Sequence, residues 1–236
     1  MFDPIFDTGP AMHDSEKSPQ VEGAPGSLGT AHKQKRALQT RGDLIRAARA
    51  IFARDGFEYA RIEDIASHAG KTRGAFYANF EDKEDVFFAI FEEDLLRDQE
   101  RVQPRLRAAV TREERIDTVT DDLLTLLRDR QRTLLSLEFK MYAIRQPNKQ
   151  NRLAELHAQM LLRCCTEKVD RLLPELAELS VEEKRRRTAE IAAILDGAAL
   201  NVLFDPSSLD EEQLRHYLRV GVCEAMRSPK GTDGCT

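Results

Sequence analysis

The segment RIEDIASHAGKTRGAFYANFEDKED, residues 61–85, decides how this chain folds. Its first apolar residues recur at helical spacing and predict a short helix: Ile62, Ile65, Ala66 and Ala69. Gly70 ends that helix, and Thr72 is a good N-cap for a further short helix that carries Phe76 and Phe80. Two short helices joined at a glycine form a helix-turn-helix candidate, which we place at about residues 61–80.

The polar residues of the second short helix suggest what it contacts. When Phe76 and Phe80 face inward, the other residues form an outward hydrogen-bonding surface suited to a DNA major groove: Thr72, Arg73, Gly74, Tyr77 and Asn79. Arg73 is the best base reader among them, because a guanidinium group can bind guanine at two atoms. Taken singly, Tyr77 is explained by packing and Lys83 by a solvated helix end, but the whole set favours DNA recognition.

Further helices are predicted on both sides of this segment. Apolar spacing predicts one helix over 40–55, ended at Asp55-Gly56, and another over about 83–97. Beyond residue 100, long amphipathic stretches follow: 116–127, 134–144, 153–173, 182–203 and 211–226. Since no strand pattern appears in the sequence, we expect an all-α protein with an N-terminal three-helix helix-turn-helix DNA-binding domain and a larger C-terminal helical bundle.

Composition divides the chain into four parts. We expect a disordered tail with a basic end over 1–36, a DNA-binding domain over 37–97, a larger domain over 98–227 and a frayed tail over 228–236. Four basic residues precede or begin the first predicted helix: Lys33, Lys35, Arg36 and Arg41. They either form an arm along the DNA or a solvated charge run, and the sequence leaves both interpretations open.

Charge supports a DNA-binding segment within an acidic protein. The 236 residues have a net charge of −5, yet residues 33–80 contain ten basic and five acidic side chains. No apolar run approaches the roughly 18 residues of a membrane span, and the N-terminus lacks a secretory signal. The four cysteines and five histidines show no metal-ligand spacing. We expect a reduced cytoplasmic protein with no membrane partner, metal or other cofactor.

Residues 61–85 resemble the signature of the tetracycline-repressor (TetR) family. The family pattern is matched at twelve positions: Asp64, Ile65, Ala66, Ala69, Gly70, Thr72, Gly74, Tyr77, Asn79, Phe80, Lys83 and Glu84. Ala60 and Arg61 depart from it, because the family usually has Thr or Ser there as a cap for the helix that follows. Lys71 also departs, since an aliphatic residue is usual at its position.

The resemblance implies roles for individual residues in DNA binding. Phosphate contacts are implied for four residues of the motif: Thr72, Tyr77, Asn79 and Lys83. Arg73 and Gly74 would lie closest to the base edges. Arg61 replaces a usual phosphate contact, and Lys71 adds a charge near the DNA backbone. The partner is therefore expected to be a double-stranded DNA operator, with repression as the family's usual mode of regulation.

The resemblance also implies a small effector bound inside the larger domain. Candidate lining residues are mostly apolar, and each is also explained as ordinary core: Phe91, Leu95, Leu124, Phe139, Tyr142, Met160 and Cys164. We therefore expect a mainly apolar effector. The predicted helix over 83–97 carries Phe91 and Leu95 towards the pocket, so it would pass the effector's signal to the DNA-binding domain.

The last two predicted helices are candidates for a homodimer interface. They combine small residues with apolar area, and the proposed interface residues are Ile191, Leu195, Ala198, Val202, Leu214, Tyr217, Leu218 and Val222. The alternative is that these residues pack within one subunit. A two-fold dimer is favoured because it matches the symmetry of a pseudo-palindromic DNA site.

Other functions are less consistent with the sequence. It contains no phosphate-binding loop, nucleophile elbow or HExxH motif, so we expect no enzyme. A thiol-based redox sensor is one alternative, because Cys164 and Cys165 are adjacent and follow Arg163. A DNA-binding architectural protein without a small ligand is another, and a collapsed effector cavity would favour it.

Overall fold

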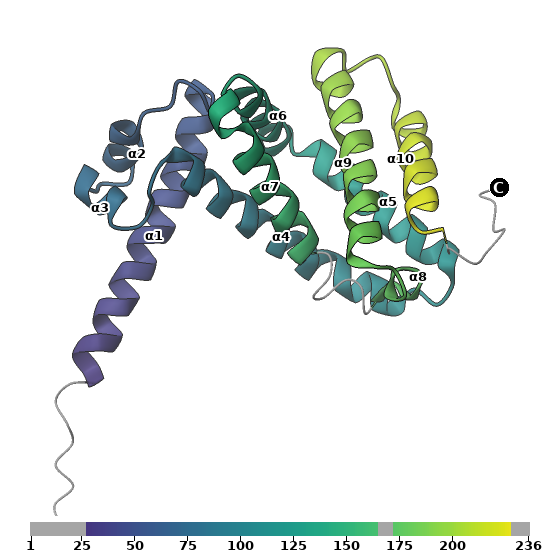
Figure 1. Ribbon diagram of the computed structural model, residues 1–236, viewed down its shortest axis with the longest axis horizontal. Coiled ribbons are helices and arrows are strands. Elements are labelled where there is room, and N and C mark those ends of the chain that lie inside the picture. Colours follow the sequence, from purple (N-terminus) through teal and green to yellow (C-terminus); the bar gives the residue numbers. More distant parts are fainter. Residues whose placement is uncertain (1–26, 165–171, 228–236) are drawn as a thin grey trace, which may run out of the picture. The chain divides into compact units, whose positions relative to one another are not determined.

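The computed structural model describes residues 27–164 and 172–227, and every regular element within them is a helix (Figure 1). The bounds are α1 Ser27–Asp55, α2 Ile62–His68, α3 Arg73–Tyr77, α4 Lys83–Ala108, α5 Arg112–Arg128, α6 Arg130–Ile144, α7 Pro147–Cys164, α8 Pro174–Ala177, α9 Val181–Phe204 and α10 Glu211–Ala225. The predicted all-α fold is confirmed. Among the described residues, no helix combines the length and apolar composition that a membrane crossing requires.

Helix α1 begins at Ser27, well before the predicted start at Thr40. The added residues are mostly good helix formers without an apolar stripe, so a search for amphipathic periodicity misses them. Within α1, the described residues up to Leu38 and those from Gln39 belong to two separate units. The rest of the predicted tail over 1–36, and the frayed tail over 228–236, lie outside the described residues.

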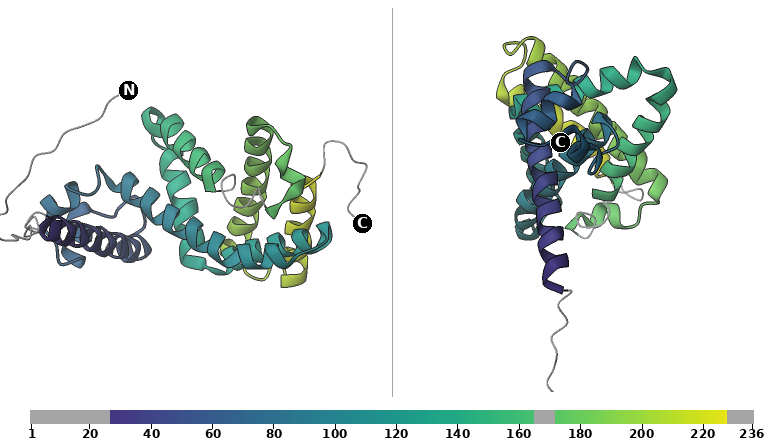
Figure 2. Two further views of the ribbon diagram at one scale, coloured as in Figure 1. Left: turned by 90° about the horizontal axis from the view of Figure 1, so that it is seen from below. Right: turned by 90° about the vertical axis from the view of Figure 1, so that its left-hand side faces the viewer.

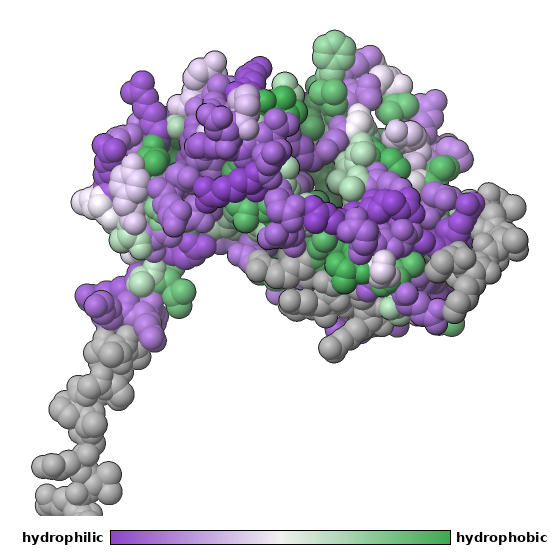
Figure 3. Space-filling view, viewed as in Figure 1, coloured by the Kyte–Doolittle hydropathy of each residue, from purple (hydrophilic) through white to green (hydrophobic). Residues whose placement is uncertain are grey.

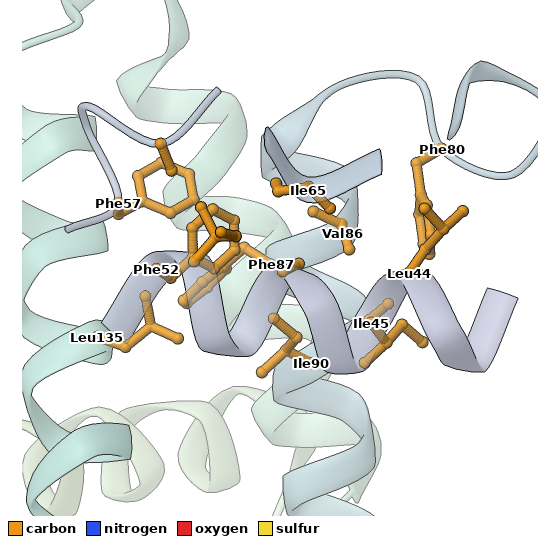
Figure 4. Packing of buried hydrophobic residues seen from close by; sticks show 14 of the residues in the cluster. Leu44, Ile45, Phe52, Phe57, Ile65, Phe80, Val86, Phe87, Ile90 and Leu135 are labelled. Carbon is orange, nitrogen blue, oxygen red and sulfur yellow. The ribbon is translucent and has the colours of Figure 1, made fainter. Parts of the chain in front are cut away.

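A cluster of aromatic rings supports the helix-turn-helix (Figure 4). We call it the aromatic core; its largest side chains are almost fully buried: Phe52, Phe57, Phe76, Phe80 and Phe87. Phe57 contacts the rings of Phe52, Phe87, Phe139 and Tyr142 at centroid distances of 5.0 to 5.6 Å. Because Phe139 and Tyr142 belong to α6, the aromatic core extends beyond the DNA-binding domain predicted for 37–97.

The remaining helices enclose two smaller apolar clusters. Helix α10 lies against α5 and beside α9 (Figures 1 and 2). One cluster joins α4, α5 and α10 through residues such as Val102, Ile116 and Val222. The other joins α5, α9 and α10 through residues such as Leu124 and Leu218. The interior of this part is therefore divided between two clusters.

Several long helices begin at polar caps, which fix their starts. Asp82 accepts a hydrogen bond from the backbone N–H of Asp85 at the start of α4. Thr111 and Glu114 form a reciprocal capping box at the start of α5, and Asp210 begins another at α10. Such caps satisfy backbone donors that have no partner within the helix, so the boundaries are locally encoded.

Candidate DNA-binding surface and effector cavity

The turn between α2 and α3 is made by Gly70 and Thr72. Gly70 has a φ of 64°, in the left-handed region that glycine adopts without steric cost. The hydroxyl of Thr72 accepts a hydrogen bond from the backbone N–H of Ala75 at 3.1 Å and so caps α3. Ile65 of α2 and Phe76 of α3 are both fully buried in the aromatic core. The turn therefore has the local structure that the sequence predicts.

Four of the predicted DNA contacts lie exposed on α3 and at its start: Thr72, Arg73, Gly74 and Tyr77. The guanidinium of Arg73 lies 5.5 Å from the ring centroid of Tyr77 and 2.9 Å from a carboxylate oxygen of Glu63. Arg61 is also exposed and stands at the N-cap of α2 without a capping hydrogen bond. The exposed face of α3 is therefore polar. Its one arginine, Arg73, makes only surface contacts with Glu63 and Tyr77, which contacts with DNA could replace.

Other predicted contacts are engaged within the protein. Lys71 forms an ion pair with Asp43 of α1, with an N–O distance of 3.1 Å. The side-chain amide of Asn79 donates to the carbonyl oxygen of Ala75 at 2.8 Å, so it closes the end of α3. These two side chains hold the helix-turn-helix on α1 and shape α3.

Lys83 points its ammonium group at the chain rather than away from it. The group donates to the carbonyl oxygens of Phe57 and Glu58, at 2.9 and 2.5 Å, and lies over the rings of Phe57 and Tyr142. Burial lowers the pKa of Lys83. In this structure Lys83 therefore joins the start of α4 to the loop after α1, a role that the sequence did not indicate.

The predicted basic arm falls within α1. Lys33, Lys35 and Arg36 are exposed residues of this helix. Arg41 lies over the ring of Phe80, with its guanidinium carbon 4.4 Å from the ring centroid, and donates to the carbonyl oxygen of Asn79. Arg41 thus packs on the segment that follows α3, at Asn79 and Phe80.

Two cavities lie among α4, α5, α6, α7, α9 and α10. The smaller has a volume of about 120 Å³ and the larger about 280 Å³. They share five wall residues, all apolar: Leu95, Leu126, Leu161, Ala192 and Leu195. Figure 3 shows hydrophobic side chains in the hollow between α7 and α9. The shared walls make the two cavities neighbouring compartments of one apolar region.

The predicted pocket residues do not all line these cavities. Phe91 lines the smaller cavity and Leu95 lines both. Leu124, Phe139 and Tyr142 are instead buried core residues. Met160 lines a separate cavity at the start of α4, and the side chain of Cys164 lies outside the described residues. His157 lines the smaller cavity and was missed, because apolar periodicity carries no signal for a polar wall residue.

An alternating chain of six charged side chains passes the two cavities, and four of its members line their walls. It passes from α1 through α4 and α6 to α5, in the order Arg49, Asp94, Arg132, Asp98, Arg101 and Asp122. Asp94 is 2.9 Å from Arg49, and Asp98 is 2.6 Å from Arg132. Neighbouring members have opposite charges, so the chain links α1 to both cavities and leaves no uncompensated ion.

Comparison with known proteins identifies the class of this chain. A model of bacterial regulatory proteins of the tetR family matches residues 44–90, and a model of the C-terminal part of BetI-type transcriptional repressors matches residues 112–224. The HTH-type transcriptional regulator AcrR of Shigella flexneri is 28% identical over 220 residues, which cover 84% of this chain and 98% of AcrR. The chain belongs to the TetR family of transcriptional regulators.

Solved structures show the same fold. FadR of Bacillus subtilis, in complex with stearoyl-CoA, has a TM-score of 0.51 and 19% identity, covering 78% of this chain and 96% of FadR. GusR of Salmonella enterica has a TM-score of 0.53 and 19% identity, covering 79% of this chain and 95% of GusR. TetR proteins are DNA-binding regulators and not enzymes, so the predicted family and the prediction that this chain is not an enzyme are confirmed.

Most of the residues predicted for dimerisation pack within a single chain. Seven of the eight predicted residues are buried or partly buried against its own apolar clusters: Ile191, Leu195, Ala198, Val202, Leu214, Leu218 and Val222. Only Tyr217 is exposed. Within one chain these seven side chains therefore pack as the alternative interpretation describes, and the interface assignment stays a prediction. The large apolar side chains exposed on α9 and α10 are Val181, Leu200, Phe204, Tyr217 and Val220.

One cysteine differs from the expectation of reduced thiols. Cys223 of α10 is buried and disulfide-bonded. The thiol pair of the redox alternative, Cys164 and Cys165, has its side chains outside the described residues. Within the described ranges, no group of His, Cys, Asp and Glu side chains is arranged to hold a metal ion.

Proposed function

We propose that this TetR protein is a homodimeric repressor that binds a pseudo-palindromic operator and is released from it by a small, mainly apolar effector. The observation that carries the proposal is the combination of an exposed polar recognition helix, α3, with an apolar cavity lined by α4. Helix α4 begins beside the helix-turn-helix and continues along the cavity, so one rigid element meets both.

DNA recognition is assigned to the exposed residues of α3. Arg73 reads a base edge, and Gly74 allows the backbone to approach the bases closely. Thr72 and Tyr77 contact phosphates, with Arg61 at the start of α2 as a further phosphate contact. Lys71, Asn79 and Lys83 hold the recognition helix in position through their contacts within the protein.

Dimerisation is assigned to the exposed apolar face of α9 and α10. Leu200, Phe204, Tyr217 and Val220 are large apolar residues without cover in one chain. A chain whose DNA site has two-fold symmetry needs a partner related by the same symmetry, so a second copy is the occupant of this face. Figure 3 shows hydrophobic surface at the upper end of α9.

Release is assigned to a shift of α4 against the aromatic core. Phe91 and Leu95 line the cavity, and Phe87, one turn before Phe91, both lines it and belongs to the aromatic core. A ligand that pushes on Phe91 changes the position of α4 and with it the spacing of the two recognition helices. The required coupling is typically about 1–3 kcal/mol, and operator DNA must weaken effector binding by the same factor.

The first experiment is selection of genomic DNA fragments by the purified protein, followed by footprinting. We expect a pseudo-palindromic site whose half-site centres are about 34–36 Å apart, or a near multiple of that distance. Sedimentation is expected to show a dimer, and Leu200→Glu with Phe204→Glu is expected to give monomers with weak DNA binding. A monomer that binds one asymmetric site tightly would contradict the proposal.

A matched pair of arginine variants tests the role of α3. Arg73→Ala is expected to weaken operator binding by about 1–3 kcal/mol and to relax preference at one base of each half-site. Arg128→Ala is the control, because Arg128 has nearly the same exposure, 61% against 62%, and lies on α5. Equal weakening on all DNA sequences would make Arg73 a phosphate contact only.

A DNA-binding architectural role without a ligand is the alternative that the cavities disfavour. A collapsed interior would support it, whereas the two apolar compartments total several hundred Å³ and adjoin α4. If operator binding proves insensitive to every compound that occupies the cavities, the architectural role is preferred.

A further inference from the structure

His157 lies at the end of a column of aromatic rings. Its imidazole stacks on Phe91 of α4, with ring centroids 4.9 Å apart and planes at 22°. Phe91 stacks on Phe87 at 6.1 Å, and Phe87 stacks on Phe139 of α6 at 3.8 Å. The column thus begins in the aromatic core beneath the helix-turn-helix and ends at His157, on the wall of the smaller cavity.

The imidazole of His157 is available to a ligand. Among the described residues it has no hydrogen-bond partner, although most of the ring is buried. Burial, with the positive charge of Lys140, lowers the pKa of His157 to about 4. The ring is therefore neutral near pH 7, with one nitrogen that donates and one that accepts a hydrogen bond.

The charged groups around the cavities already have partners. Lys140 is hydrogen-bonded to Asp196, between α6 and α9. Asp94, Arg132, Asp98 and Asp122 belong to the alternating charge chain. Arg187 donates to two backbone carbonyl oxygens, and Lys184 is likewise engaged. Among the described residues that line the cavities, a charged ligand would find no unpaired counter-charge, and an ion buried without a partner is strongly unfavourable.

We propose that His157 determines effector specificity by hydrogen-bonding an uncharged aromatic ligand that carries a hydroxyl or carbonyl group. The ligand's ring occupies the smaller cavity, which Phe91 and His157 both line, at the end of the aromatic column. The inference rests on the proposed function, because it takes these cavities to be the effector site. An apolar extension of the ligand enters the larger cavity, which is lined by residues such as Val102, Leu106, Val119, Ile191, Val222 and Met226.

This ligand class differs from the acyl-CoA bound by the structural neighbour FadR. A nucleotide thioester carries several negative charges, and the described cavity walls offer no unpaired cation to receive them. A neutral ring with one polar group matches two features of the smaller cavity, its apolar walls beside Phe91 and the nitrogen atoms of His157.

The test compares four compounds that share one ring system. The full-length protein is loaded with the neutral fluorescent probe N-phenyl-1-naphthylamine, which is then displaced by naphthalene, 1-naphthol, 1-naphthoate or 1-naphthylmethylammonium. We expect 1-naphthol to displace the probe at about three- to tenfold lower concentration than naphthalene, the effect of one net hydrogen bond. The anion and the cation are expected to be weaker than naphthalene.

Variants of His157 separate the hydrogen bond from packing. His157→Phe keeps an aromatic ring, so naphthalene affinity should stay within twofold while the advantage of 1-naphthol disappears. His157→Gln supplies a donor and an acceptor and should restore part of that advantage. His68→Phe is the matched control, because His68 is exposed on α2 and should leave all four affinities unchanged.

The outcomes distinguish this inference from the proposed function. Best binding by a charged compound, absence of probe binding, or an unchanged 1-naphthol preference in His157→Phe would each overturn the role of His157. Operator binding is measured on the same preparations by gel shift. Intact operator binding with failed selectivity refutes the inference alone, whereas intact selectivity with no selected DNA refutes the regulator proposal alone.

Discussion

The interior beneath the helix-turn-helix differs from the interior between α5 and α9. The first is filled by phenylalanine rings that are at most 2% exposed, among them Phe52, Phe57 and Phe76. The second is divided into two apolar clusters with cavities of about 120 and 280 Å³ near them and charged side chains on the cavity walls. The aromatic core is therefore tightly packed, whereas the interior between α5 and α9 contains unfilled volume.

The difference follows from what each region does. The recognition helix α3 has five residues, too few to be stable without tertiary packing, so the aromatic core must hold it. A ligand site instead needs volume that side chains do not fill, and unfilled volume lowers stability. Stability is therefore expected to be concentrated around α1–α3 and the first turns of α4, and ligand response around α5–α9 and the part of α4 from Phe91 onward.

The largest expected effect is the loss of one ring from the aromatic core. Phe57→Ala removes a fully buried side chain that contacts four other rings, so we expect a loss of about 3–5 kcal/mol of unfolding free energy. Leu195→Ala, at the wall of both cavities, should cost only about 1–2 kcal/mol. Urea unfolding followed by circular dichroism measures both, and equal losses would contradict the difference in packing.

The buried charge chain gives the next largest effect. Asp98→Asn removes the carboxylate shared by Arg132 and Arg101, whose remaining partners are Asp94 and Asp122, so the chain is left with three arginines and two carboxylates. Because the Asp98 side chain is only 10% exposed, a loss of about 3 kcal/mol is expected. Asp121→Asn is the control. Asp121 also pairs with two arginines but is 39% exposed, and its loss should cost less than about 1 kcal/mol.

Adding side-chain volume should lower stability in the aromatic core but leave it nearly unchanged at the cavities. Ala48→Leu introduces three carbons into the aromatic core at a position with no exposure, and overpacking should cost about 1–3 kcal/mol. Ala192→Leu fills space shared by the two cavities, so its stability should stay within about 0.5 kcal/mol. Probe binding should fall only in Ala192→Leu. Intact probe binding there would place the ligand elsewhere.

The sequence predicts the features that are encoded locally. Gly70, the cap at Thr72 and the buried Phe76 and Phe80 follow from residue types and helical spacing within residues 61–85. The fold class follows from the same periodicity along the chain. These features need no knowledge of distant contacts, so an amphipathic pattern is sufficient.

Features that depend on distant pairing could not be predicted. The role of Lys83 depends on the carbonyl of Phe57, and the charge chain joins residues as far apart as Arg49 and Arg132. The inward and outward faces of α9 also differ little in sequence, because both contain alanine and leucine. Periodicity identifies an apolar face but not what covers it: four of the predicted interface residues are buried and three partly buried within one chain.

The pH dependence of stability should distinguish the two regions through His157. In the unfolded chain an imidazole binds a proton near pH 6.5, but burial lowers the pKa of His157 to about 4. Between these values the unfolded state binds more protons, so acidification destabilises the folded state by up to about 1.4 kcal/mol per pH unit. His157→Phe should lack this contribution. Identical pH profiles from pH 7 to pH 4 would contradict the burial of the ring.

The smallest expected effect concerns the exposed charges of the recognition surface. The guanidinium of Arg73 is paired with Glu63 at 2.9 Å, and both side chains are more than half exposed. An exposed pair contributes about 0–1 kcal/mol to stability, so it can be exchanged for a contact with DNA, unlike the buried pair at Asp98. The Glu63 carboxylate also repels phosphates that approach α3.

Glu63→Gln removes both the competing partner and the repelling charge. We expect unchanged stability and operator binding tighter by about 0.5 kcal/mol, roughly a twofold change in affinity, measured by fluorescence anisotropy at fixed salt. Glu113→Gln is the control, because Glu113 is similarly exposed but pairs with Arg219 at the other end of the chain. Weaker binding by Glu63→Gln would mean that Glu63 positions Arg73 for base recognition. The exposed surface of α3 would then be preorganised, as the aromatic core beneath it is.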